Sequence, residues 1–471
     1  MGGIPEGRYT FFRITPDAND LCVFAVKRGN IKKRFDPHAN HPRFQTIFSS
    51  LKNHKIVPLR EYAKRIFSGI TPKSGGDAYT EADDGIFFIK SGYLSNDGLL
   101  TIDATSKIKL DIHNGLMKSS KLNKNDVLIA IVGATIGKIA LFDLDCEANI
   151  NQAIAAVRLK DTILPEFLVA YMLSPFGQAY LEYLKRPVAR ANINLQEIGE
   201  IGIPDLSIKQ QKEFASVVFS ARNKKDNRLK QAEELLSSLS EYVLDRLGLS
   251  FDIPNKKIIY ATKHADIDSR IDAEYYHSER MSALHSMKSN KEISARKLSD
   301  VVSFHRDVVN STNNENCLGL AGVESQTGEL SGIKEYAVGQ AYVYKKGDIL
   351  YGRLRPYLNK VIVAEYGGIC STEFHVMRVL DTATLIPEYV ATILRSDLIL
   401  SQTKHMMTGN THPRISNEDV QNLYIPVPDI TVQQEIVDEL QKRRLKARQL
   451  KTEAEQEWQE AKEQFEKELL Q

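Results

Sequence analysis

The sequence predicts an α+β protein made of two similar globular modules, each followed by a long helix. The first observation behind this prediction is an internal repeat, in which three short blocks recur at a constant offset of 222 residues. They are Lys124–Leu128 with Lys346–Leu350, Leu164–Leu168 with Ile386–Val390, and Ile203-Pro204 with Ile425-Pro426. The second observation is a helical spacing of apolar residues after each copy. A repeat of this length is a duplicated domain with its connector, because solenoid units are far shorter.

Upstream, Arg34–Pro37 corresponds to Arg270–Ala273 at the larger offset of 236 residues, so the first copy has the longer connection between these blocks. Residues 1–55 precede the first module as a lead segment with a basic patch. The first module is expected at residues 56–207. Its best core strands are Ile86–Ile89 and Val127–Val132, and Pro165 starts a predicted helix that extends to Tyr183.

Each module is followed by one long predicted helix. The first helix is expected within 208–248, and the second within 431–471. Residues 249–296 form a linker and the start of the second copy, and residues 297–430 form the second module. The apolar residues of the first helix are Phe214, Val218, Ala221, Leu229, Ala232, Leu236, Leu239 and Val243. Those of the second helix are Ile436, Leu440, Ala447, Leu450, Ala454, Trp458, Ala461, Phe465 and Leu469.

This near-heptad spacing favours pairing of the two helices with each other, and the alternative is a solvated helix packed on its own module. Two antiparallel helices of about 36 residues span roughly 54 Å. One turn of duplex DNA is about 34–36 Å long, so such a pair suits two half-sites about one turn apart.

Composition sets limits on the protein class. The 471 residues are 42% hydrophobic and 26% charged, as is usual for a soluble protein of several domains. With a net charge of only +2, any nucleic-acid binding must come from local basic surface. The four cysteines lack metal-ligand or redox spacing, which favours a reduced cytoplasmic protein. The N-terminus lacks a signal-peptide pattern, and Val127–Phe142 is too short and too interrupted to span a membrane.

These features together resemble the specificity subunit of type I restriction-modification systems, from about Arg34 to the end of the chain. The motifs that carry the resemblance recur in the same order in both copies. In the first copy they are Gly69–Pro72, Asp126–Leu128, Gly133–Lys138, Asn151-Gln152, Ile201–Pro204 and Gln210-Gln211. In the second they are Gly347–Leu350, Ile425–Pro428 and Gln433–Ile436.

The resemblance implies a fold of two target recognition domains separated by an antiparallel two-helix coiled coil, with a pseudo-two-fold internal repeat. Each domain would recognise one half of a bipartite site in double-stranded DNA. The helices would bind two methyltransferase subunits, and a motor-nuclease subunit is a further partner. The partner subunits would bind S-adenosylmethionine and methylate adenine, so this chain would be non-catalytic, without a cofactor, a metal or a membrane of its own.

The second copy departs from the motifs of the first. Phe304–Asp307 occupies the region of the Gly-Ile-Thr-Pro signature, and Ser371–Phe374 stands where the first copy has Asn149–Gln152. Recognition modules for two different half-sites would diverge in this way.

Enzymatic motifs are not evident in the sequence. Gly133–Lys138 has three residues between its glycines and Ile139 after its lysine, whereas a phosphate-binding loop needs four residues and a Ser or Thr. We therefore expect a tight turn between buried strands, with glycines at positive φ. Neither an adenine-methyltransferase tetrapeptide nor a histidine ligand pattern is present.

Candidate DNA-binding residues of the first module gather at predicted strand ends, in the Gly-rich turn and in the loop after the helix. They are Lys73, Ser74, Lys90, Ser91, Tyr93, Lys138, Arg186, Arg190, Asn192 and Asn194. Tyr93 is alternatively a core residue. Basic residues in a proline-fixed loop suit phosphate contacts, and the alternative for that loop is a solvated segment.

Candidates in the second module lie at the corresponding positions. They are Arg306, Arg353, Arg355, Tyr357, Asn359, Lys360, Thr411, His412 and Arg414. At the 222-residue offset His412 corresponds to Arg190, and Ser416 to Asn194. Arginine can bind guanine, and asparagine adenine, through two hydrogen bonds each, whereas the alternative is a salt-bridged surface.

Three other functions remain open on the sequence. The same subunit type could serve another methylation-linked anti-phage system. A coiled-coil scaffold would bind proteins and would show no salt-dependent affinity for DNA. A stand-alone DNA-modifying enzyme would bind S-adenosylmethionine itself.

Overall fold

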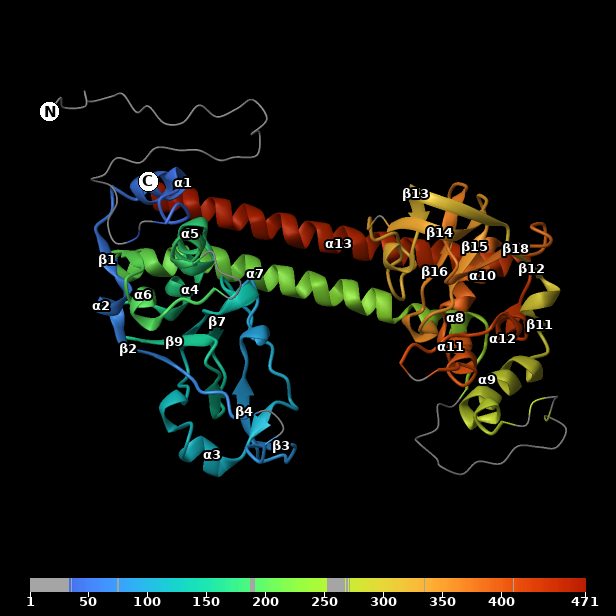
Figure 1. The fold of residues 1–471 in the computed structure, drawn as a ribbon, viewed down its shortest axis with the longest axis horizontal. Coiled ribbons are helices and arrows are strands. Elements are labelled where there is room, and N and C mark those ends of the chain that lie inside the picture. Colours follow the sequence, from blue (N-terminus) through green and yellow to red (C-terminus); the bar gives the residue numbers. More distant parts are fainter. Residues whose placement is uncertain are drawn as a thin grey trace, which may run out of the picture. The chain divides into compact units, whose positions relative to one another are not determined.

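The computed structural model describes residues 34, 36–73, 76–186, 191–251, 267, 270, 272–333, 335–409 and 411–471. The lead segment before Arg34 and the candidate residues Ser74 and Arg190 lie outside this part. The chain divides into two compact units (Figure 1). Unit 1 comprises the residues up to Asn227 together with Glu453–Gln471, and unit 2 comprises Arg228–Thr452. Each of the two long helices contributes residues to both units.

Unit 1 is built around an antiparallel sheet of four strands in the order β2-β9-β6-β7. Their bounds are Ala63–Ser68, Ile154–Leu159, Asp126–Ala130 and Ile139–Phe142. In β6, Val127 and Ile129 belong to the core that includes helices α4 and α5, whereas Leu128 and Ala130 belong to a second core with Ile89. Because both faces of the sheet are buried, the strand is apolar from Val127 to Ala130, which explains the run found in the sequence.

The remaining strands of unit 1 form a second sheet and a short pair. The second sheet has the order β3-β5-β4-β8, and β1 pairs with β10. Their bounds are Tyr79–Thr80, Lys107–Ile108, Ile86–Ile89, Ala148–Ile150, Ile56–Pro58 and Gly202–Pro204. Short helices α1, α2, α3 and α6 span Pro42–Ser50, Leu59–Tyr62, Leu110–Asn114 and Leu195–Gly199.

The helix predicted from Pro165 to Tyr183 is two helices, α4 (Pro165–Leu173) and α5 (Pro175–Leu184). Ser174 between them has an extended backbone, with φ −71° and ψ 164°. Proline disfavours the helical conformation in the residue before it and has no N–H to donate, so the continuous-helix prediction was wrong at Pro175.

Unit 2 repeats the central sheet in the order β12-β18-β15-β16, with the pair β11-β19 in place of β1-β10. These strands span Val302–His305, Phe374–Val379, Ile349–Gly352, Val361–Val363, Ser294–Lys297 and Tyr424–Val427. Helices α9, α10, α11 and α12 span Ser278–Ser289, Pro387–Leu394, Asp397–Thr403 and Asn417–Gln421. Instead of the second sheet of unit 1, unit 2 has a closed barrel of β13 (Val308–Leu318), β14 (Glu335–Tyr344) and β17 (Gly368–Ser371).

Each of the two units also contains an equivalent set of hydrogen bonds. Gln211 donates to the carbonyl groups of Thr162 and Leu206 and accepts a bond from the Leu164 N–H. Gln433 makes the same three bonds to partners displaced by 222 residues, namely Thr384, Pro428 and Ile386. The glutamine motif at the start of each long helix therefore fixes that helix to its own module.

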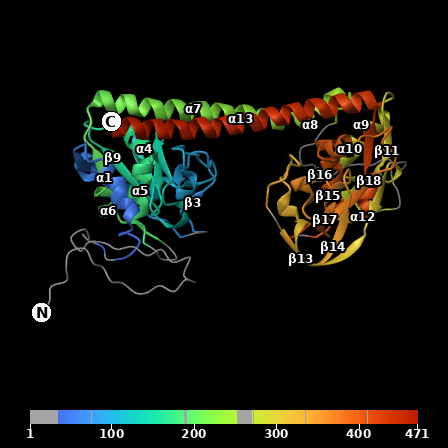
Figure 2. The same cartoon turned by 90° about the horizontal axis from the view of Figure 1, so that it is seen from above.

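The long helices contact each other within each unit (Figure 2). The helix predicted within 208–248 is α7 (Ile208–Ser237) followed by α8 (Leu239–Arg246), and the second long helix is α13 (Ile430–Leu470). In unit 1, Phe214 packs edge-on against Phe465, and Lys225 forms an ion pair with Glu455 at 2.9 Å. In unit 2, Ala232 packs with Ala447 and Leu450. Later residues of α7 meet earlier residues of α13, so the helices run antiparallel in each unit.

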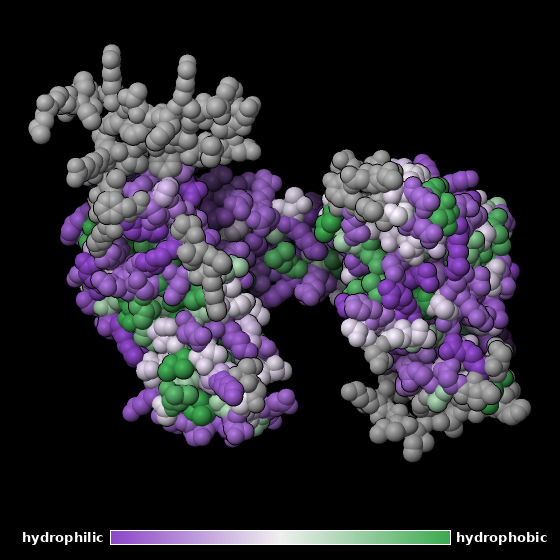
Figure 3. Space-filling view, viewed as in Figure 1, coloured by the Kyte–Doolittle hydropathy of each residue, from purple (hydrophilic) through white to green (hydrophobic). Residues whose placement is uncertain are grey.

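The surfaces in view are mostly hydrophilic, with separate apolar patches (Figure 3). Within the described part of the chain, none of the helices combines the length and the hydrophobicity needed to cross a bilayer.

Candidate nucleic-acid interface

The Gly-rich segment of unit 1 is a tight turn between β6 and β7. Gly133 and Gly137 have φ values of 64° and 101°, and a 3₁₀ turn spans Gly133–Thr135. Only glycine adopts such values without steric cost. The predicted turn with positive-φ glycines is confirmed. Lys138 is half-buried at its end, and its backbone carbonyl accepts a hydrogen bond from the Ala130 N–H.

This turn lies against the loop that follows α5. The Gly133 N–H donates to the Ala191 carbonyl at 2.8 Å, and the Ile193 N–H donates to the Ile131 carbonyl at 3.0 Å. Asn192 lies between these two bonds with its side chain exposed. The structure therefore brings together two candidate segments that are about 55 residues apart in the sequence.

Unit 2 repeats this arrangement atom for atom. The Arg355 N–H donates to the Pro413 carbonyl at 2.7 Å, and the Ile415 N–H donates to the Arg353 carbonyl at 3.1 Å. Each of these four residues is the counterpart, at the 222-residue offset, of a residue in the unit 1 pair. The basic stretch after β15 and the Thr411–Arg414 loop thus form one surface, which also carries His412 with an exposed side chain.

Arg355 occupies the position of Gly133 and keeps its backbone conformation. Its φ is 49°, in the left-handed region that costs a residue with a Cβ about 1–2 kcal/mol. The neighbouring Tyr357 is 42% exposed. Arg355 therefore carries a backbone cost that Gly133 avoids at the equivalent position.

Two further arginines flank Arg355. Arg414 makes a bidentate ion pair with Glu373, with shortest distance 2.8 Å, and this bond raises the pKa of Arg414. An exposed ion pair contributes little to stability, so a phosphate could displace Glu373 at small cost. Arg353 donates to the Thr372 carbonyl at 3.3 Å, and its Nε lacks a partner in the described part of the chain. No pattern in the sequence predicted the pairing of Glu373 with Arg414.

Several predicted residues have structural contacts instead of free side chains. Asn359 is only 3% exposed, and its amide donates to the Gln326 side chain and the Arg395 carbonyl, so it is not placed to contact a base in this conformation. Lys360 donates to the Leu320 carbonyl at 2.7 Å.

In unit 1, Asn194 caps α6 in a capping box with Glu197, as Ser416 caps α12 in unit 2. Arg186 pairs with the same Glu197 at 2.6 Å. These local bonds satisfy the side chains of both Asn194 and Arg186 without a ligand.

The other candidates of unit 1 lie around β4 and the Gly69–Pro72 signature. Lys73 and Lys90 are exposed, Ser91 is half-buried, and the Tyr93 hydroxyl donates to Asp103 at 3.0 Å. Gly69 packs so closely that a Cβ would lie 1.6 Å from the Ile150 carbonyl oxygen, which explains the glycine of the signature. In unit 2, Arg306 is exposed directly after β12.

One histidine cluster in the described residues has the spacing of a metal site. It consists of His277, Glu279 and His405, whose ligand atoms lie within 4.8 Å of one another. However, His405 bonds Glu274 and Glu279 through its two ring nitrogens, and Lys404 pairs with Glu279. Glu279 is thus paired with the Lys404 cation, and both ring nitrogens of His405 are occupied by hydrogen bonds within the chain.

Comparison with known proteins agrees with this duplicated plan. A family model described as "Type I restriction modification DNA specificity domain" matches residues 66–235 and 290–457, one stretch in each copy. The chain belongs to this family. The resemblance found in the sequence is thereby confirmed.

Two curated relatives from Escherichia coli are similar to parts of the chain. The EcoBI specificity subunit is 29% identical over 215 residues, which cover 44% of this chain and 45% of the relative. The EcoDI specificity subunit is 25% identical over 119 residues, which cover 24% and 26%. Each match therefore spans less than half the length of the relative.

Two solved structures are similar over most of the chain. One comes from work on the assembly and conformational transition of the type I R-M system, with 16% identity, a TM-score of 0.49 and coverage of 88% of this chain and 96% of that one. The other is a type I S subunit from M. genitalium, with 13% identity, a TM-score of 0.45 and coverage of 88% and 95%.

Proposed function

We propose that this chain is the sequence-specific DNA-recognition subunit of a type I restriction-modification complex that methylates adenine. The observation that carries the proposal is the paired-loop surface present in both copies, with the same backbone hydrogen bonds and different side chains. A shared backbone with different side chains suits proteins that bind two different sequences in the same way.

Each copy would bind one half of a bipartite site. The target recognition domains correspond to residues 56–207 and 297–430. In the first, Lys138 and Asn192 lie on the paired loops, and in the second Arg353, Arg355 and Arg414 do so. The second surface therefore carries more positive charge and more bidentate donors, which favours guanine contacts there.

The long helices, 208–248 and 431–471, would form a coiled coil that sets the distance between the half-sites. The antiparallel contacts found within each unit support this pairing. The 41 residues of α13 correspond to about 60 Å at the helical rise of about 1.5 Å per residue. A rod of this length exceeds one turn of duplex DNA, about 34–36 Å.

Catalysis would belong to partner subunits. Two methyltransferase subunits would bind along the helices and supply S-adenosylmethionine, and a motor-nuclease subunit would join the same complex. The chain itself would be a non-catalytic protein of the cytoplasm.

The test is footprinting of the complex reconstituted with its methyltransferase subunits. We expect protection of two short sequences separated by an unprotected spacer, with an affinity that falls steeply as salt increases. Arg355→Ala should weaken one half-site by about 1–3 kcal/mol and leave the other unchanged. Protection without sequence preference, or binding that is independent of salt, would exclude the proposed function.

A further inference from the structure

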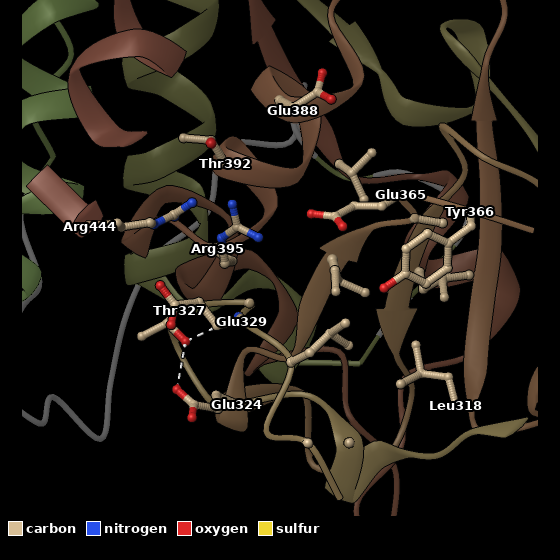
Figure 4. Close-up of a pocket in the computed structure, with 18 of the residues that line it drawn as sticks. Leu318, Glu324, Thr327, Glu329, Glu365, Tyr366, Glu388, Thr392, Arg395 and Arg444 are labelled. Carbon is tan, nitrogen blue, oxygen red and sulfur yellow. Dashed lines mark hydrogen bonds between the residues drawn. The ribbon is translucent and has the colours of Figure 1, made fainter. Parts of the chain in front are cut away.

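A cavity of about 1210 Å³ lies within unit 2, between the β-hairpin loop Glu324–Glu329, the end of α10 and α13 (Figure 4). Its lining includes Arg395 and Arg444, whose guanidinium groups point toward the same space. None of the arginines of the paired-loop surface, Arg353, Arg355 and Arg414, lines it. The cavity is therefore separate from the candidate DNA interface.

Among the described residues neither arginine is held in an ion pair, although the Glu329 carboxylate lies near Arg444. Arg395 follows α10 and donates one bond, from Nη1 to the Val361 carbonyl at 2.6 Å, while its Nε has no partner. The Nε of Arg444 is likewise unpaired, and neither residue has an ion pair within the described part of the chain. Burial, followed by the like charge of Arg444, holds the pKa of Arg395 well below its usual value. Both side chains are half-buried, and cations in such positions are normally paired, so an anion in the cavity would stabilise this arrangement.

Unit 1 has an arginine at one of these two positions with carboxylates around it, although the Nε of this arginine also lacks a partner in the described part of the chain. At the 222-residue offset, Arg444 corresponds to Arg222 and Arg395 to Leu173. Arg222 donates to the Gly98 carbonyl at 3.2 Å and lies near the carboxylates of Asp97, Asp143 and Asp226. In unit 2 the carboxylate near Arg444 is that of Glu329, and Arg395 stands in place of the leucine. The second copy has therefore gained a positive charge at this place.

We propose that the unit 2 cavity binds a small phosphorylated ligand, whose phosphoryl oxygens accept hydrogen bonds from Arg395 and Arg444. The planar donor fork of arginine matches phosphate oxygens. A phosphate monoester carries a charge of about −1.5 to −2 at neutral pH and so balances both guanidinium groups, whereas a carboxylate balances one. The cavity is large enough for more than a phosphate, and Tyr366 adds an aromatic side chain to its wall.

A small ligand fits this place better than a duplex. The Nε of Arg395 is fully covered, and Gly328 packs against its guanidinium so closely that a Cβ would lie 2.4 Å from Nη1. A DNA backbone binds on an open surface, and it cannot reach a guanidinium group that a loop covers. The remaining wall includes the carboxylates of Glu324, Glu365 and Glu388 and the cations of Arg448 and Lys451, so it offers no excess of positive charge for further phosphates of a nucleic acid.

The test is isothermal titration of the full-length chain with inorganic phosphate and with adenosine monophosphate, at constant ionic strength in chloride. We expect saturable binding, weakened at least tenfold by Arg395→Leu, which restores the residue of the first copy, and by Arg444→Gln. Lys446→Gln, an exposed residue of α13 outside the cavity, removes one positive charge and should bind as the unchanged protein does.

Hydrogen exchange of the unsubstituted protein gives a second, independent measurement. Phosphate should slow exchange in Gly328–Leu330 and in the Gln441–Lys451 segment of α13. Absence of saturable binding, equal weakening by Lys446→Gln, or unchanged binding in both arginine variants would overturn the proposal. Displacement of bound phosphate by a short DNA duplex would assign the cavity to DNA and would overturn it as well. A negative result for phosphate binding would not affect the footprinting test of the proposed function, because the cavity and the paired-loop surface share no residue.

Discussion

Replacement of Arg355 by glycine separates the folding role of this residue from its binding role. Arg355 has φ 49°, and its counterpart Gly133 has φ 64°. Removal of the Cβ relieves about 1–2 kcal/mol of left-handed strain. Glycine also gives the unfolded chain more conformational freedom, which lowers the free energy of unfolding by about 0.4–1 kcal/mol and offsets part of this gain. We therefore expect Arg355→Gly to raise the free energy of unfolding of unit 2 by roughly 0.5–1 kcal/mol.

The same variant should lose affinity for DNA. If the guanidinium contacts a base, its removal costs about 1–3 kcal/mol, which is about 5- to 150-fold in the dissociation constant for one half-site. Arg355→Ala is the matched control, because alanine keeps the Cβ and therefore the strain. It should lose the same affinity without gaining stability, so the two variants differ in folding and agree in binding.

Two measurements decide this prediction. Hydrogen exchange in peptides from β15 and β16 reports the stability of unit 2, while fluorescence of Trp458, the only tryptophan of the sequence, serves as a reference for unit 1. Fluorescence anisotropy of the reconstituted complex on duplexes with one altered half-site reports binding. The reasoning is refuted if Arg355→Gly destabilises unit 2, or if both variants keep full affinity for both half-sites.

Other expected outcomes follow from buried polar groups and from the helices. Burial, with a contribution from Arg353, lowers the pKa of His375 to about 4, below the value of about 6.5 of an unfolded chain. Between these pH values the unfolded state takes up a proton that the folded state does not. The free energy of unfolding of unit 2 should therefore fall by up to about 3 kcal/mol as pH falls from 6.5 to 4. In urea unfolding, His375→Gln should flatten this pH dependence. Asp348→Asn breaks the bidentate pair with Arg378 and should cost unit 2 about 3 kcal/mol, whereas unchanged hydrogen exchange would show that the pair contributes nothing. Asn359→Ala leaves the Arg395 carbonyl unpaired and should cost about 1–3 kcal/mol, with Asn359→Asp distinguishing the lost bond from the lost volume. Deletion of one heptad from both α7 and α13 should shorten the spacer that the complex accepts, and an unchanged spacer in a methylation assay would argue against the helices as a ruler.

Most of the architecture could be predicted because it depends on local patterns. The repeat offset aligned the central strands, and apolar spacing located both long helices. The breaks at Ser174 and Ser238 were missed because the apolar pattern continues across them. Ser238 donates to the Leu235 carbonyl, a local bond that competes with the helix. The barrel strand β13 was also missed, because its polar run from Asn310 to Asn316 lacks the alternation of a half-buried strand.

The candidate site was predicted in pieces, and its assembly was not. The basic stretches after β15 and α11 were both singled out, yet their pairing depends on hydrogen bonds such as that between Arg355 and Pro413, far apart in the chain. Asn359 was placed among the DNA-binding candidates because its residue type suits adenine. Its left-handed backbone, with φ 57°, turns the side chain toward the Arg395 carbonyl, and tertiary contacts of this kind leave no mark in sequence spacing.

The equivalent positions of the two copies fall into two groups, and the division has a physical basis. Positions that fix the fold keep their chemistry, as Gln211 and Gln433 do with identical sets of three hydrogen bonds. At the paired loops Gly133 is replaced by Arg355 with φ still positive, and at the unit 2 cavity Leu173 is replaced by Arg395. A strained or half-buried arginine lowers stability unless something binds it, so Arg355 and Arg395 are expected to contact ligands, the second DNA half-site for Arg355 and a phosphorylated ligand for Arg395.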